Sequence, residues 1–154
     1  HRGMNLKRRE DGRPVIELDA NLLFGPMRHR VSPDHFASLD RIAETIASTR
    51  YPVMIEGHTD AIPARGKHSN FYLSAARAAS VQEYLEHAAG LQPGLITAVG
   101  MGSSSPHPEA KSPRDARHRR VEIVAVPREG AGAGATSRAQ ETEIEEDGTV
   151  RIPW

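Results

Sequence analysis

Hydrophobic and polar positions along the chain predict short strands separated by two amphipathic helices. β-prone runs occupy residues 15–18, 53–56, 95–99 and 119–126, and their length and β-branched content favour strands over helices. Apolar residues recur at helical spacing over 33–49 and over 74–90. The order β-α-β-α-β-β predicts a two-layer α/β (α+β) sandwich with one mixed sheet and the helices on one face. The helix after 53–56 predicts a crossover to a parallel strand, and the last strand is expected to run antiparallel.

Capping signals predict where the two helices begin and end. A Ser-Pro pair at 32–33 marks the start of the first helix, and a Tyr-Pro pair at 51–52 marks its end. For the second helix, Ser74 is the predicted N-cap and Gly90 the predicted C-cap. Arg77 then falls at the third helical position, beside the stripe of residues expected to be buried: Ala78, Val81, Leu85 and Ala88.

The two ends of the chain differ from its middle. Residues 1–14 are rich in basic side chains with little to bury, so we predict a linker or amino-terminal arm. Residues 15–126 form the predicted folded domain. Residues 127–154 begin with a Gly-Ala run and carry a net negative charge, which predicts a disordered tail. Because the chain opens on His1, we expect it to be a fragment of a longer protein that carries the membrane anchor.

Composition narrows the class of function. The 154 residues are enough for one domain with a single core. Twenty basic and twenty acidic residues cancel, so no overall field favours nucleic acid or an anionic membrane surface. Cysteine is absent, which excludes disulfides and thiolate metal sites. No apolar run approaches the roughly 20 residues of a spanning helix.

Candidate chemistry lies in the loop between the strand at 53–56 and the second helix. Asp60 follows the carboxyl end of the strand, where open α/β sheets bind ligands, and Arg77 lies near the start of the helix. An acceptor-only carboxylate facing a bidentate guanidinium suits a zwitterion, with an ammonium on Asp60 and a carboxylate on Arg77. Spacing alone favours a simpler interpretation, in which the two side chains pair with each other as a surface ion pair or cap the loop.

Four motifs in order resemble one known family. GHTD at 57–60, SN..LS.ARA..V..YL from Ser69, G.G...P from Gly100 and RRVEI from Arg119 are similar to the OmpA-like carboxy-terminal domain that binds peptidoglycan. The resemblance covers roughly residues 15–126. It implies a β-α-β-α-β-β fold that holds the diaminopimelate unit of the peptide stem without catalysis and without a cofactor or metal.

The resemblance also assigns roles to individual residues. By position, Asp60 matches the aspartate that takes the ligand's ammonium, and Arg77 matches the arginine that takes its carboxylate. The other positions expected to line or shape the same pocket are Thr59, Asn70, Leu73 and Arg120. His118 departs from the family pattern, which commonly has Asn there, and this change is expected to affect the pocket's geometry or its pH response.

Within the family, GHTDAIP and the upstream L..NLLF most resemble the periplasmic domain of the flagellar stator protein MotB. That similarity implies a periplasmic, cell-wall-anchoring domain of an inner-membrane protein, a homodimer, and an ion-channel partner subunit reached through the missing amino-terminal part. The alternative is the cell-wall anchor of an outer-membrane protein or a Pal-like lipoprotein.

Other function classes have weaker support. Eight histidines, including His58 and His68 in the candidate loop, raise the possibility of a metal-dependent hydrolase, but no HExxH or similar cluster is present. Neither GxGxxG after a strand nor a P-loop occurs, which argues against nucleotide binding. The basic cluster from Lys111 to Arg120 lacks interleaved aromatics, which argues against nucleic acid.

Overall fold

The computed structural model describes residues 3–64, 69–126, 143–144 and 150–151. Five strands form one mixed sheet in the order β1-β2-β5-β3-β4, and only β3 and β4, among neighbours in this described sheet, are parallel. The strands are β1 (Met4–Arg8), β2 (Pro14–Asp19), β3 (Val53–His58), β4 (Ile96–Gly100) and β5 (Arg120–Ala125). The helices are α1 (Ala20–Phe24), α2 (Phe36–Thr49) and α3 (Asn70–Ala89), with 3-10 turns η1 (Pro33–His35) and η2 (Ala116–His118).

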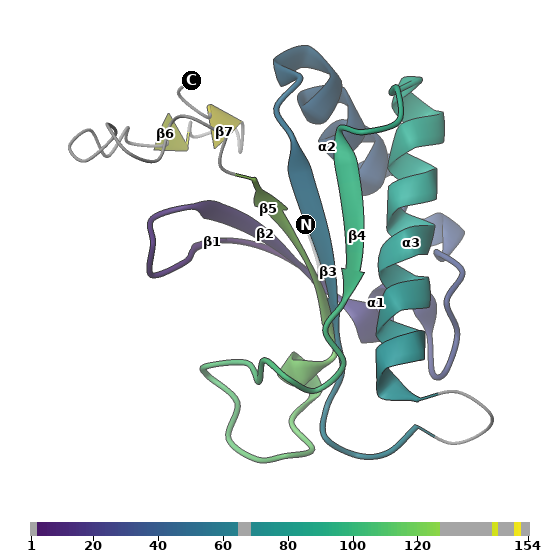
Figure 1. Ribbon diagram of the computed structural model, residues 1–154, viewed down its shortest axis with the longest axis vertical. Coiled ribbons are helices and arrows are strands. Elements are labelled where there is room, and N and C mark those ends of the chain that lie inside the picture. Colours follow the sequence, from purple (N-terminus) through teal and green to yellow (C-terminus); the bar gives the residue numbers. More distant parts are fainter. Residues whose placement is uncertain (1–2, 65–68, 127–142, 145–149, 152–154) are drawn as a thin grey trace.

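The helices cover one face of the sheet, as the sequence predicted (Figure 1). Alternate strand residues and the apolar stripes of the helices form one core, which includes Leu39, Ile55, Val81, Leu85 and Val121. The parallel pairing of β3 with β4 and the antiparallel pairing of β5 confirm the predicted mixed sheet. The carboxyl ends of β3 and β4 therefore meet at one end of the molecule, the lower end in Figure 1, together with α1 and the start of α3.

Two glycines bring α3 unusually close to the sheet. Gly57 and Gly100 are register partners on β3 and β4. A Cβ atom at Gly57 would lie 2.1 Å from the backbone carbonyl oxygen of Ser74, and one at Gly100 would lie 2.7 Å from the backbone nitrogen of Ala75. Only glycine leaves room for this approach. The buried Ser74 hydroxyl completes the contact by accepting a hydrogen bond of 2.9 Å from the Gly102 N–H.

The predicted start of the second helix was wrong. The helix begins five residues earlier, at Asn70, and its N-cap is Ser69, whose side chain accepts a hydrogen bond from the Tyr72 N–H. Ser74 is an internal residue that packs on the sheet, so Arg77 is the eighth helical residue rather than the third. At that distance Arg77 lies beyond the free N–H groups of the helix start, so these groups do not help Arg77 to attract an anion. The C-cap prediction is confirmed, because Gly90 adopts the left-handed conformation with φ 60°.

The prediction of a linker over residues 1–14 was also wrong, because Met4–Arg8 forms edge strand β1 on β2. Two basic side chains of this segment have partners on the sheet face away from the helices. Lys7 pairs with Glu17 at 3.2 Å, and Arg9, just after the strand, pairs with Glu56 at 2.5 Å. These ion pairs replace the apolar burial that the sequence of this segment lacks.

Most of the predicted tail, 127–154, lies outside the described residues. Within it Glu143–Ile144 pairs antiparallel with Val150–Arg151, so the prediction of disorder does not hold for these four residues. Among the helices of the described residues, none has the length and apolar character needed to cross a membrane.

Candidate functional site

A cavity of about 410 Å³ opens where β3 ends and α3 begins. Its walls come from α1 and the turn that follows it, the loop after β3, the first turns of α3, and the residue that precedes β5. The charged side chains that line it are Asp60, Arg77 and Arg119. The described lining residues also include Asn21, Met27, Thr59, Ile62, Asn70 and Leu73.

Asp60 is held rigidly at the floor of this cavity. Asp60 is 9% exposed, and its Oδ1 accepts a hydrogen bond of 3.0 Å from the Ile62 N–H. Its Oδ2 accepts one of 2.5 Å from Arg119 Nη1. The side-chain amide of Asn70 donates to the backbone carbonyls of Asp60 and Ile62, which ties the loop to the first turn of α3. The carboxylate is therefore fixed before any ligand arrives.

Arg77 reaches the opposite wall of the cavity from α3. Its Nε donates to the Arg28 carbonyl at 2.9 Å and its Nη2 to the Gly25 carbonyl at 3.2 Å. Its guanidinium carbon lies 5.3 Å from the centre of the Phe24 ring, in a cation–π contact. The hydrogen bonds that it makes within the described chain leave Nη1 for a ligand. Burial and then repulsion from Arg119 lower the pKa of Arg77.

Asp60 and Arg77 are not paired with each other in the described structure. Asp60 pairs with Arg119, and Arg77 donates to backbone carbonyls. The surface ion pair that the sequence left open is therefore absent from this part of the chain. What remains is one carboxylate and one guanidinium with spare donor capacity, lining the same cavity.

Of the other predicted site residues, Thr59, Asn70 and Leu73 line the cavity and Arg120 does not. Arg120 lies on the other face of the sheet, where Nη1 and Nη2 donate to the carbonyls of His118 and Ser105. Arg119 takes the place at the cavity instead. The alternation of side chains along β5 predicts this difference, because Val121 and Ile123 face the helices and Arg120 must then face away from them.

Asn21 is a further site residue that the sequence reasoning missed. Its side-chain oxygen accepts a hydrogen bond of 2.8 Å from Arg119 Nε. It is positioned by Asp19, the N-cap of α1, whose carboxylate accepts from the Asn21 N–H. His118 does not line the cavity. Its Nδ1 accepts from the His107 N–H and its Nε2 donates to the Ser112 carbonyl, so it shapes the loop that leads to Arg119.

The opposite face of the sheet carries a buried ion network. Glu17, Glu122 and Glu56 are register neighbours on β2, β5 and β3. His58 Nε2 lies 3.2 Å from carboxylate oxygens of both Glu56 and Glu122. Burial would lower the pKa of His58, but its hydrogen bonds to Glu122 and Glu56 outweigh this and raise it. Burial would raise the pKa of Glu122, but the hydrogen bond from His58 and the charge of Arg120 lower it to about 2.

Glu56, His58 and Glu122 form the one group, among the described residues, with three potential metal-ligating atoms close together. Arg9 Nη2 already contacts Glu56 and Glu122 at 2.5 and 3.3 Å, and Arg120 Nε lies 3.4 Å from Glu122. Two guanidiniums thus supply the positive charge that a metal would bring. The arrangement is that of a structural ion network. His68, the other histidine considered for a metal, lies outside the described residues.

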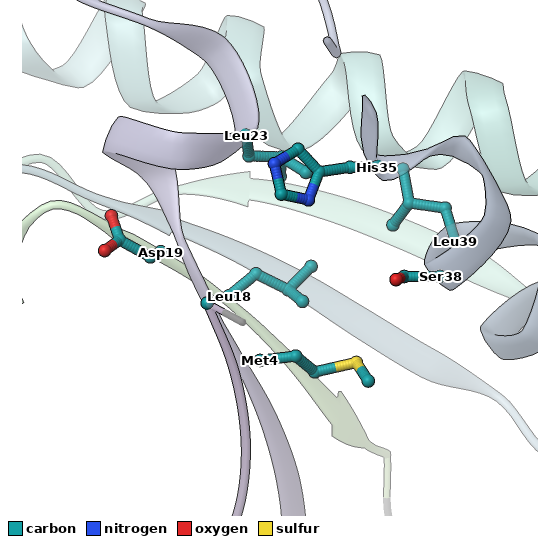
Figure 2. A pocket seen from close by; sticks show the side chains of 8 residues that line it. Met4, Leu18, Asp19, Leu23, His35, Ser38 and Leu39 are labelled. Atoms are coloured by element: carbon teal, nitrogen blue, oxygen red, sulfur yellow. The ribbon is translucent and has the colours of Figure 1, made fainter. Parts of the chain in front are cut away.

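A second cavity lies between the sheet and α2, beside α1. Figure 2 shows the side chains of Met4, Leu18, Leu23 and Leu39 around it, together with the ring of His35. Its volume is about 10 Å³, which is room for about one water molecule. This gap in the core is too small for a ligand.

Sequence comparison identifies the family. The family model described as "OmpA family" matches residues 23–120, which include Asp60, Arg77 and Arg119. The chain belongs to the OmpA family. A relative among curated proteins, the "Uncharacterized protein YtxE" of Bacillus subtilis (strain 168), is 33% identical over 124 residues. That match covers 79% of this chain but only 51% of YtxE, so the chain spans about half the length of this relative.

Solved structures of OmpA-family domains share the fold. The periplasmic domain of Helicobacter pylori MotB is 27% identical with a TM-score of 0.65, and the match covers 80% of this chain and 81% of that one. The cell wall anchor of the T6SS from Pseudomonas aeruginosa is 29% identical with a TM-score of 0.69, covering 82% and 89%. The OmpA-family fold and the similarity to MotB periplasmic domains are thereby confirmed.

Proposed function

We propose that this OmpA-family domain binds peptidoglycan without catalytic turnover, by holding the zwitterionic end of diaminopimelate in the peptide stem. One observation carries the proposal: Asp60 and Arg77 line a single cavity and are not paired with each other in the described structure. Asp60 is the acceptor for the ligand's ammonium, and Arg77 Nη1 is the donor for its carboxylate. The similarity to a protein described as a cell wall anchor supports the same ligand.

The geometry supports binding rather than chemistry. Within the described lining of the cavity, no hydroxyl is paired with a histidine or carboxylate base, and Thr59 donates its hydroxyl to the Asp60 carbonyl. Nucleophilic catalysis needs such a base within hydrogen-bond reach. Asp60 is likewise committed to Arg119 and the Ile62 N–H. A fixed pair of opposite charges matches the task of recognition.

The test is co-sedimentation of the purified protein with sacculi. Asp60→Asn keeps the size of the side chain and removes its charge, and Arg77→Lys keeps the charge and removes the forked donor; each is expected to lower binding at least tenfold. Glu44→Gln and Arg41→Lys, exposed on α2, are the matched controls and should bind like the unaltered protein. Circular dichroism checks that each variant is folded. Unchanged sedimentation of both site variants would reject the proposed function.

A narrower proposal concerns the machine that the domain serves. We propose an inner-membrane-anchored, MotB-like stator subunit that works in the periplasm as a homodimer with an ion-channel partner, because both the sequence motifs and a MotB structure resemble this chain. The similar likeness to a T6SS anchor favours a second candidate, the wall anchor of another envelope machine. Sedimentation-velocity runs at high protein concentration that show only monomers would count against the stator and leave the ligand assignment intact.

A further inference from the structure

Arg119 is the third charged residue of the cavity, and its position is well defined. Its carbonyl accepts from the Ala20 N–H and its own N–H donates to the Ala116 carbonyl, so α1 and η2 fix its backbone. Its side chain, 31% exposed, bonds Asn21 through Nε and Asp60 through Nη1. It therefore reaches across the cavity floor to the carboxylate proposed to bind the ligand.

This contact changes what the cavity offers to a ligand. Asp60 is already neutralised by Arg119, and each of its carboxylate oxygens already accepts a hydrogen bond. Among the described lining residues, the three charged side chains sum to one excess positive charge. Burial lowers the pKa of Arg77, and repulsion from Arg119 lowers it further. An incoming amine alone would have to displace an intramolecular partner and would increase that excess.

We propose that Arg119 makes the cavity selective for ligands that carry an ammonium and a carboxylate on the same carbon, and selective against simple amines. When such a ligand enters, its ammonium binds the Asp60 carboxylate, either together with Arg119 or in its place. The ligand's carboxylate then supplies the counter-charge for Arg119 and Arg77. Each charge then keeps an opposite partner. An alkylamine offers no carboxylate, so Arg119 would be left without one. Arg119 thus acts as a specificity-determining residue through negative selection. This inference rests on the proposed function.

Three small molecules that share the same five-carbon segment separate the charges. The probes are meso-diaminopimelate, pentane-1,5-diamine, which lacks both carboxylates, and pimelate, which lacks both amines. Titration calorimetry measures each with the unaltered protein and with Arg119→Gln. The unaltered protein should prefer diaminopimelate to the diamine at least tenfold. In Arg119→Gln this ratio should fall at least tenfold, because diamine binding strengthens while diaminopimelate and pimelate binding weaken.

Arg117→Gln is the matched control, because Arg117 is exposed on η2, the 3-10 turn that ends just before Arg119, and donates to the Glu109 carbonyl instead of lining the cavity. It should leave the ratio unchanged. An unaltered ratio in Arg119→Gln, with diaminopimelate still bound by the unaltered protein, overturns this inference alone. If the unaltered protein binds neither sacculi nor diaminopimelate, the proposed function falls and this inference falls with it.

Discussion

The glycine at 57 gives the sharpest test of how the sheet positions the site. Replacing it with alanine puts a methyl group 2.1 Å from the backbone carbonyl oxygen of Ser74, whereas real Cβ contacts are essentially never under 3.0 Å. The contact must lengthen by at least about 0.9 Å. The obstacle is helical backbone, so no side-chain rotation can relieve it. Overpacking of this kind costs about 1–3 kcal/mol, and we expect the upper end, about 3 kcal/mol, for Gly57→Ala.

Binding should suffer as well as stability. The part of α3 that has to move carries Asn70, Leu73 and Arg77, three lining residues of the cavity. A recognition site tolerates only about 0.5 Å of displacement, so we expect at least tenfold weaker binding to sacculi by the folded Gly57→Ala protein.

Urea unfolding followed by circular dichroism measures the stability of Gly57→Ala, and co-sedimentation measures its binding. Thr97→Ala, at an exposed position of neighbouring β4, is the control and should cost at most about 1 kcal/mol, the span of β-propensity scales. The unfolding midpoint of Gly57→Ala should fall clearly below that of the control. An unchanged midpoint together with unchanged binding would refute the argument that Gly57 determines how closely α3 packs on the sheet.

Three further outcomes are expected. Ser74→Ala removes the acceptor of the buried Gly102 N–H, which should cost about 1–3 kcal/mol in urea unfolding; Ser74→Thr keeps an acceptor hydroxyl and should cost less. Glu122 has a pKa lowered to about 2, so its contribution to stability is present above its unfolded pKa near 4.5 and is lost as pH falls from there towards 2. Glu122→Gln should therefore make the unfolding free energy depend less on pH in that window. His58 has a raised pKa, so its contribution is complete below its unfolded pKa near 6.5 and is lost as pH rises through the folded value; nuclear magnetic resonance should show its ring titrating above 6.5.

The sequence predicted most of the architecture because hydrophobic periodicity reports burial directly. The strands around Ile55 and Ile123 and the helix that buries Leu39 follow from that signal. Strand β1 could not be found in the same way, since Lys7 is paired with Glu17 on the next strand and Arg9 with Glu56, far away in sequence. A basic segment without apolar alternation looks like a linker until its partners are known.

The candidate site was predictable in part. The motifs led to Asp60 and Arg77, and the structure lines one cavity with both. The start of α3 was missed because Ser69 and Ser74 are equally good capping residues, and the close approach of the helix to Gly57 decides between them. Arg119 was missed in favour of Arg120 because the choice depends on which strand face each side chain occupies.

The edge strand β1 also determines how this domain would carry a mechanical load. Gly3 accepts a hydrogen bond from the Asp19 N–H, so the chain enters β1 beside α1, at the end of the sheet that holds the ligand cavity. A tether pulling Gly3 away from α1 would load the Met4–Leu18 pair first and the other pairs between β1 and β2 after it, because these ends of the two antiparallel strands lie side by side. The force would then pass through α1 to Arg119 and Asp60 over a short path. Tension between the tether and the ligand would thus leave α2 and the far end of the sheet largely unstressed.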